Sequence, residues 1–146
     1  MLAYAEEHLS VATNERKELR IYINDRDIEL QRIATEMGYR TGAGSEEMSH
    51  LVIPDPFPAL ALPEGFRLKS LADENLNVVV EAPGGNFVSY CGMWFEPVNR
   101  IAYVEPVATD PDYRRMGLGR AAVLEGVRRC GERGATVAYV GTAMPF

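Results

Sequence analysis

The sequence has 146 residues, of which 47% are hydrophobic and 25% charged, a composition typical of one soluble globular domain. A formal charge of −6 disfavours nucleic-acid binding, since binders of DNA or RNA usually carry a basic face. Two cysteines cannot build a disulfide framework, and with two histidines they show no metal-ligand spacing. No stretch is long and apolar enough to cross a membrane, and residues 1–10 do not resemble a signal peptide. We therefore expect a cytoplasmic protein with no metal and no nucleic-acid or membrane partner.

The first third of the chain is predicted to contain short elements in the order helix, strand, helix, strand. Their ranges are 1–9, Leu19–Ile23, Asp27–Met37 and Met48–Ile53. The second helix is indicated by apolar residues spaced i, i+3, i+4 and i+7, and Gly38 follows it where a left-handed cap belongs. Residues 54–65 hold four prolines, which favour a linker or an extended crossing segment.

The remainder of the chain is predicted to be richer in strand, with a hairpin, a third long strand, a helix and a final strand. The predicted ranges are a strand at Phe66–Leu68, at most a helical turn at Leu71–Leu76, strands at Val78–Ala82, Phe87–Phe95 and Ile101–Thr109, a helix at Gly117–Arg133 and a strand at Thr136–Val140. The third long strand is expected to bend at Pro106. The helix is expected to bury Val123, Val127 and Cys130.

Glycines and arginines meet where the strand that ends at Thr109 turns into this helix. Gly117 and Gly119 let the backbone approach a ligand, and the first-turn N–H groups and the helix dipole favour an anion such as a phosphate. A Walker A loop is excluded, because the last glycine precedes Arg-Ala and not Lys-Ser. A dinucleotide fingerprint fits G-x-G-x-x-A, but a charged turn separates strand from glycines and no acid follows. A glycine-rich turn without any ligand remains the plain alternative.

The whole segment, with Arg114-x-x-Gly117-x-Gly119 after a strand ending Val107-Ala108-Thr109, resembles motif A of the GCN5-related N-acetyltransferases. The resemblance extends from about residue 101 to 141, and more loosely back to residue 66. It implies an α+β fold with a mixed, mainly antiparallel sheet flanked by helices. It also implies transfer of an acetyl group from acetyl-CoA to a primary amine by direct attack, with acetyl-CoA as co-substrate and no metal.

The same resemblance assigns the site residues. The residues implied to bind acetyl-CoA are Val107, Ala108, Thr109, Arg114, Arg115, Met116, Gly117, Leu118, Gly119 and Arg120. The backbone of Val107–Thr109 would pair with the pantetheine arm, and the N–H groups from Arg115 through Arg120 would hold the pyrophosphate. Glu105 is the candidate catalytic base; the alternative is a solvated carboxylate at the end of a strand.

Other chemistry-bearing residues receive plainer interpretations. Cys91 is expected in the core, not as a nucleophile, and Tyr103 is a weaker candidate base that is expected to be packed. His8 and His50 are expected at the surface or in packing. Trp94 and Phe95 either line an acceptor pocket or pack in the core, and core packing is favoured.

The order of the elements departs from the family's. The family places a further helix and two strands after the strand that corresponds to Thr136–Val140, whereas here residues 17–53 resemble such a C-terminal set, ahead of the linker at 54–65 and the motif A part at 66–146. We therefore expect a permuted or swapped arrangement that completes one sheet, with a homodimer. Where the family often carries a general-acid tyrosine, this sequence has Ala34. The alternative function is thus a non-catalytic CoA-binding module or an incomplete piece of a tandem acetyltransferase. The acidic charge slightly favours a cationic small-molecule or peptide acceptor.

Overall fold

The computed structural model describes residues 7, 11–13, 16–44, 47–71 and 76–142. The chain forms two compact units, residues 1–45 and residues 46–146. The predicted helical turn at 71–76 falls largely outside the described residues, as do His8 and all of the predicted helix at 1–9 except Glu7, which is helical.

The first unit holds a short hairpin and one helix. Strands β1 (Val11–Thr13) and β2 (Arg16–Glu18) pair antiparallel, and α2 spans Ile28–Glu36. Helix α2 confirms the helix predicted at Asp27–Met37. The Asp27 carboxylate caps the start of this helix by accepting a hydrogen bond from the Leu30 N–H at 3.0 Å. The predicted strand at Leu19–Ile23 is wrong, because residues 19–24 have no regular structure. An alternating pattern makes a strand only where a ladder partner exists, and here the described ladder forms between β1 and β2.

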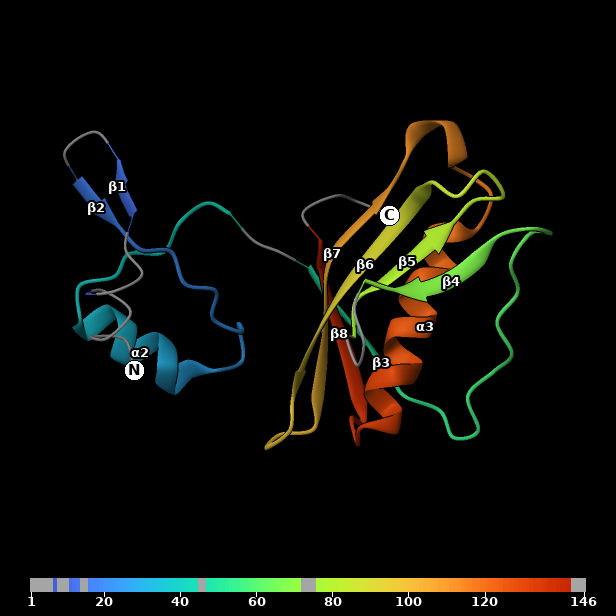
Figure 1. Ribbon diagram of the computed structural model, residues 1–146. Helices are drawn as coiled ribbons and strands as arrows, with labels where there is room; N and C mark the ends of the chain where they lie inside the picture. Colours follow the sequence, from blue (N-terminus) through green and yellow to red (C-terminus); the bar gives the residue numbers. More distant parts are fainter. Residues whose placement is uncertain (1–6, 8–10, 14–15, 45–46, 72–75, 143–146) are drawn as a thin grey trace. The chain divides into compact units, whose positions relative to one another are not determined.

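The second unit is built on a six-stranded sheet with the order β3-β8-β7-β6-β5-β4 (Figure 1). Its elements are β3 (Glu47–Val52), β4 (Arg67–Ser70), β5 (Val78–Glu81), β6 (Phe87–Glu96), β7 (Ile101–Thr109), the 3-10 helix η1 (Pro111–Tyr113), α3 (Leu118–Glu132) and β8 (Val137–Thr142). Neighbouring strands are antiparallel except β7 and β8, which are parallel. The predicted mixed, mainly antiparallel sheet is confirmed.

Strand β3 completes the sheet within the same chain. It pairs with β8 over its whole length, from Glu47 opposite Thr142 to Val52 opposite Val137. An N-terminal strand thus covers the edge that β8 presents away from β7; that residues 17–53 as a set stand in for the family's C-terminal part stays a prediction. The proline-rich segment that follows has neither helix nor strand, and its Phe57 and Leu62 pack against the core of this unit.

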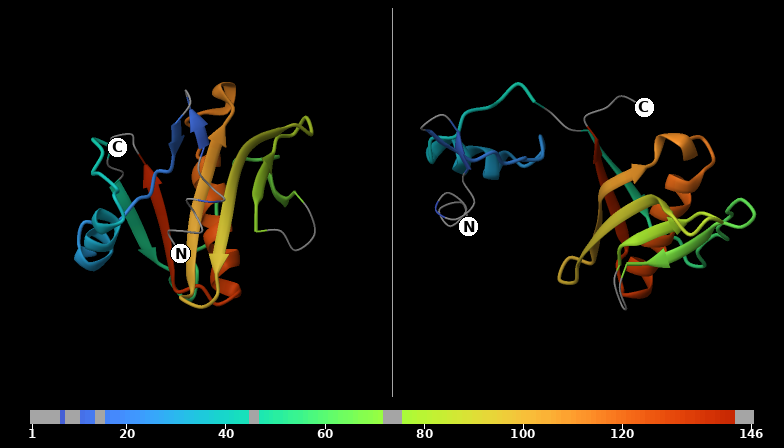
Figure 2. Two further views of the ribbon diagram at one scale, coloured as in Figure 1. Left: turned by 90° about the vertical axis from the view of Figure 1, so that its left-hand side faces the viewer. Right: turned by 45° about the horizontal axis from the view of Figure 1, so that its top comes forward.

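Helix α3 packs against one face of the sheet, over β5, β6 and β7 (Figure 2). The core between them contains the fully buried side chains Leu118, Val78, Val80, Val127, Cys91 and Cys130. Val127 and Cys130 are buried as predicted, whereas Val123 is half-buried at the margin of the core. Gly126 permits the close approach of the helix, because a Cβ there would lie 2.6 Å from Met93 Cγ.

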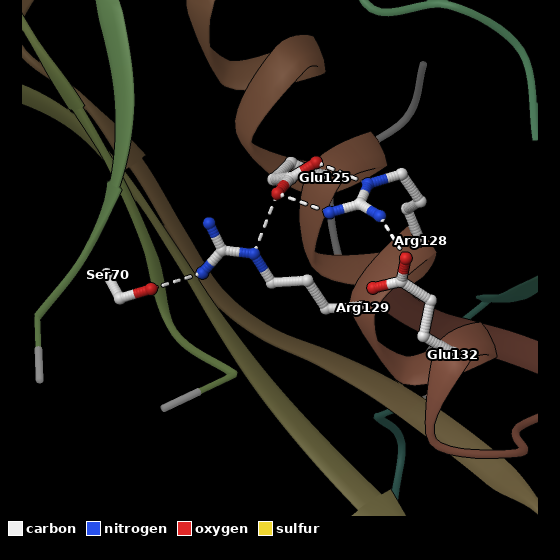
Figure 3. Close-up of polar contacts among 5 residues, drawn as sticks. All are labelled: Ser70, Glu125, Arg128, Arg129 and Glu132. Atoms are coloured by element: carbon white, nitrogen blue, oxygen red, sulfur yellow. Dashed lines mark hydrogen bonds and ion pairs between the residues drawn. The ribbon is translucent and has the colours of Figure 1, made fainter. Parts of the chain in front are cut away.

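An ion-pair cluster joins α3 to the edge strand β4 (Figure 3). Glu125 is 8% exposed, and its carboxylate accepts hydrogen bonds from Arg128 Nε and Arg129 Nε, both at 2.8 Å. Arg129 also donates to Ser70 Oγ at the end of β4. Burial, the largest single influence, raises the pKa of Glu125, but the hydrogen bonds and charges of the two arginines together hold that pKa below its usual value.

Candidate functional site

Strands β7 and β8 pair only at their beginnings. The ladder runs from Ile101 opposite Val137 to Tyr103 opposite Tyr139 and then stops, although β7 continues to Thr109. The two strands separate beyond this point (Figure 2, left). Within the described residues, the edge of β7 that faces β8 therefore has no strand partner after Tyr103, and its main-chain groups are available to an extended ligand.

A β-bulge lies at the point of separation, on the other edge of β7. Two residues of β7, Glu105 and Pro106, oppose the single residue Gly92 of β6, between the pairs Cys91–Val107 and Met93–Val104. Glycine is required on β6, because a Cβ at residue 92 would lie 2.4 Å from the Glu105 carbonyl oxygen. The expected bend at Pro106 thus takes the form of a bulge that sets the course of the strand end.

The predicted pantetheine-pairing residues lie beyond this bulge, on the unpaired edge. Val107 and Ala108 are exposed and Thr109 is half-buried. Glu105 is exposed at the bulge itself. Side chains alternate along a strand, and Ala102 and Val104 belong to the core beneath α3, so Tyr103 and Glu105 lie on the opposite face.

The predicted anion-binding turn leads directly from β7 into α3. The chain passes through η1, and α3 begins after Gly117, whose φ of +80° is left-handed and whose N-cap position makes no side-chain hydrogen bond. The first main-chain bond of the helix runs from the Ala121 N–H to the Gly117 carbonyl, so the N–H groups before it have no partner inside the helix. Apart from its chain neighbours and the helix's own nearby backbone, no atom lies within 4 Å of a Cβ placed on Gly117, so the turn is open at this residue.

The side chains around this turn differ in exposure. Arg114, Arg115 and Arg120 are exposed around the turn, as is Met116. Leu118 is only 1% exposed, because its side chain anchors the first turn in the core. Of the implied ligand-binding residues, Leu118 therefore offers its main-chain N–H and not its side chain.

A pair of hydroxyl groups beneath this turn was not identified from the sequence. Ser89 on β6 is buried, and its hydroxyl lies 3.1 Å from the Ala108 carbonyl oxygen and 2.9 Å from Thr109 Oγ1. A carbonyl can only accept, so Ser89 donates to Ala108, and Thr109 donates to Ser89. A Cβ on Gly119 would lie 3.0 Å from Thr109 Oγ1, so the small residue lets the helix start sit on the strand end. The sequence signal was a serine at a core position of a predicted strand.

Other predicted residues can now be placed. Cys91 is buried, as predicted, and burial, with a smaller effect from Cys130, raises the pKa of its thiol to about 12, which disfavours the nucleophilic thiolate. His50 is exposed, as expected. The expected core packing of Trp94 is wrong, since its side chain is 69% exposed on the face opposite α3, whereas Phe95 is half-buried against the core. Strand alternation places the two rings on opposite faces.

No group of three or more His, Cys, Asp or Glu residues among those described could hold a metal ion. In the described part of the chain, no helix is long and apolar enough to cross a membrane. The absence of a metal from the reaction stays a prediction.

Comparison with known proteins adds independent findings. A family model described as the acetyltransferase (GNAT) family matches residues 45–145. The sequence matches no curated protein. The fold is similar to a GCN5-related N-acetyltransferase from Sphaerobacter thermophilus, at 14% identity and a TM-score of 0.60, over 83% of this chain and 49% of that one. It is also similar to a GCN5-related N-acetyltransferase from Kribbella flavida, at 17% identity and a TM-score of 0.62, over 79% of this chain and 54% of that one. The chain thus spans about half the length of either structure.

Proposed function

Because the chain belongs to the acetyltransferase (GNAT) family, we propose that it transfers an acetyl group from acetyl-CoA to a primary amine by direct attack. One observation carries the proposal. The unpaired edge of β7 and the left-handed turn at Gly117 form one continuous segment, so an extended arm and an anion could be bound together. An acetyl-CoA molecule presents both, as its pantetheine arm and its pyrophosphate.

Each part of the segment has a binding role in this proposal. The main chain of Val107–Thr109 pairs with the amide groups of the arm in the manner of an added strand. The N–H groups of Arg115–Arg120 face the pyrophosphate, and the helix dipole favours its charge. The exposed guanidinium groups of Arg114, Arg115 and Arg120 add positive charge to an otherwise acidic chain.

The chemistry requires a base and an oxyanion donor. The exposed carboxylate of Glu105 takes a proton from the substrate ammonium, and the neutral nitrogen then attacks the thioester carbonyl carbon. A bond forms between the nitrogen and that carbon, the bond from the carbon to sulfur breaks, and CoA leaves as a thiolate; the nitrogen loses a second proton as the amide forms, and the thiolate gains one. A main-chain N–H of β7 stabilises the oxyanion; Pro106 has none, so the donor belongs to a residue beside it. We assign no general acid, because the resemblance of residues 17–53 would put Ala34 where the family often carries tyrosine.

Replacement of the base tests the proposal. The variant Glu105→Gln should lower kcat at least about a hundredfold, because a positioned base contributes that much or more. Its affinity for acetyl-CoA, measured by calorimetry, should stay within about twofold of the parent, since the variant keeps the size and the main chain of the residue. CoA release is followed with a thiol reagent. Unchanged turnover would show that Glu105 is not the base but a solvated carboxylate at the end of a strand.

Two observations favour the alternative of a CoA-binding module without turnover, or of one piece of a larger enzyme. The chain spans about half the length of the two similar structures, and the resemblance of residues 17–53 to the family's C-terminal part would put Ala34 in the place of the usual acid. Under this alternative, acetyl-CoA binds but no amine is acetylated. The cytoplasmic location, the homodimer and the cationic character of the acceptor remain part of the proposal.

A further inference from the structure

Four aromatic side chains form a row across the face of the sheet that lies opposite α3. The strand registers place Trp94 of β6 opposite Tyr103 of β7, Tyr103 opposite Tyr139 of β8, and Tyr139 opposite His50 of β3. The rings of His50 and Tyr139 are in contact, with centroids 5.9 Å apart. The row is therefore built into the register of four neighbouring strands.

No element of the second unit's described part covers the row. Trp94 is 69% exposed and His50 is exposed, while Tyr103 and Tyr139 are half-buried. In the described part of the second unit, the only helices are η1 and α3, and α3 covers the other face. An exposed tryptophan near the end of a strand, beside further rings, is a feature that marks binding surfaces in globular proteins.

The row is adjacent to the proposed reaction centre along β7. Along β7 the order is pantetheine-pairing edge at Val107–Thr109, base at Glu105, and ring at Tyr103. A strand rises about 3.3 Å per residue, so the main-chain positions of Glu105 and Tyr103, which share a face, are about 7 Å apart. This spacing suits a nitrogen at the carboxylate and a ring two or three bonds away.

The charge beside the row suits a cation. Glu105 is exposed, and the residues around it in the row carry no lysine or arginine. The nearest basic side chain that the sheet ladder places on this face is Lys69 of β4, which is three strands from β7 and ion-paired with Glu81. An ammonium group at Glu105 therefore meets a negative charge and the faces of aromatic rings, both of which attract it.

We infer that the acceptor is a primary amine carried on a flat aromatic group through a linker of two or three bonds. The aromatic group lies against Trp94 and Tyr103, and the ammonium group lies at Glu105. This inference rests on the proposed function and names the substrate class of the same site.

Three amines of equal charge test whether the acceptor carries an aromatic group: 2-phenylethylamine, 2-cyclohexylethylamine and butylamine. We expect kcat/KM for the aromatic amine to exceed that for butylamine at least tenfold, with the cyclohexyl compound between them, since ring contacts add to simple apolar burial. Trp94→Ala should raise the KM for 2-phenylethylamine about tenfold and leave the KM for acetyl-CoA unchanged. Trp94→Phe should restore most of the loss. Val98→Ala, at an exposed turn position outside the row, is the matched control.

A binding measurement makes the result independent of turnover. Trp94 is the single tryptophan of the chain, so its emission reports directly on the row. With CoA present, 2-phenylethylamine should change this emission saturably and butylamine should not. The inference would be overturned, with the proposed function intact, if butylamine were acetylated as efficiently as 2-phenylethylamine. It would also be overturned if 2-phenylethylamine left the Trp94 emission unchanged. A chain that does not bind acetyl-CoA overturns both.

Discussion

The glycine at the bulge provides the sharpest structural prediction. In Gly92→Ala the new Cβ would lie 2.4 Å from the Glu105 carbonyl oxygen, 2.9 Å from Pro106 Cδ and 3.0 Å from the Glu105 carbonyl carbon. The oxygen belongs to the main chain of β7 and must retreat by at least 0.6 Å (3.0 − 2.4) to reach the shortest contact that real Cβ atoms show. No flexible side chain can absorb this movement.

Overpacking of this kind costs about 1–3 kcal/mol, and we expect the upper part of that range because the obstacle is backbone. For a unit of this size, a loss of about 2–3 kcal/mol lowers Tm by roughly 10–20 °C. The variant should also bind acetyl-CoA more weakly, since the bulge sets the course of Val107–Thr109. Thermal unfolding followed by Trp94 emission measures the first effect, and calorimetry measures the second.

The matched control is Gly84→Ala, at a turn position where no atom lies within 4 Å of the new Cβ and φ is not left-handed. This control should melt within a few degrees of the parent. Equal Tm values for the Gly92→Ala and Gly84→Ala variants would refute the close contact between Gly92 and the Glu105 carbonyl group.

Two further predictions concern the ion-pair cluster and the thiols. Glu125→Gln should lower the free energy of unfolding at neutral pH by about 2 kcal/mol, because it removes a largely buried negative charge from Arg128 and Arg129, which are partly exposed and keep Glu132 and Ser70 as partners. The folded-state pKa of Glu125 is lowered, so its contribution is complete above the ordinary glutamate pKa of about 4.3 and is lost as the pH falls through the folded-state value. Urea unfolding at a series of pH values should show the difference between parent and variant shrinking in acid; a constant difference contradicts the assignment. Burial raises the thiol pKa to about 12 for Cys91 and about 11 for Cys130, so a thiol reagent should label neither in the native protein and both in urea, and rapid native labelling would contradict their placement.

Local signals in the sequence were sufficient for α2 and α3 and for the six strands of the second unit, whereas β1 and β2 were not predicted. The Asp27 cap and the glycines after each helix mark their ends, because capping is a matter of a few neighbouring residues. The alternating run at Leu19–Ile23 carried the same kind of signal but has no ladder partner among the described residues. Pairing is a property of the whole sheet, which periodicity does not report.

At the candidate site, too, local features could be predicted from the sequence and long-range contacts could not. The glycines and arginines of the turn at 114–120 are contiguous and could be identified from the sequence, whereas the hydroxyl pair of Ser89 and Thr109 joins residues twenty positions apart. The exposure of Trp94 also depends on tertiary structure, because it follows from the absence of a helix over that face in the described part of the second unit.

Calorimetric titration of the full chain with acetyl-CoA tests the central claim most directly. The control is the double variant Gly117→Asp, Gly119→Asp, which places two negative charges at the helix start and brings a side chain against Thr109. The account predicts micromolar binding by the parent and none by the variant, with both chains folded by circular dichroism. No binding by a folded parent chain, or equal binding by both, would contradict the proposed acetyl-CoA site.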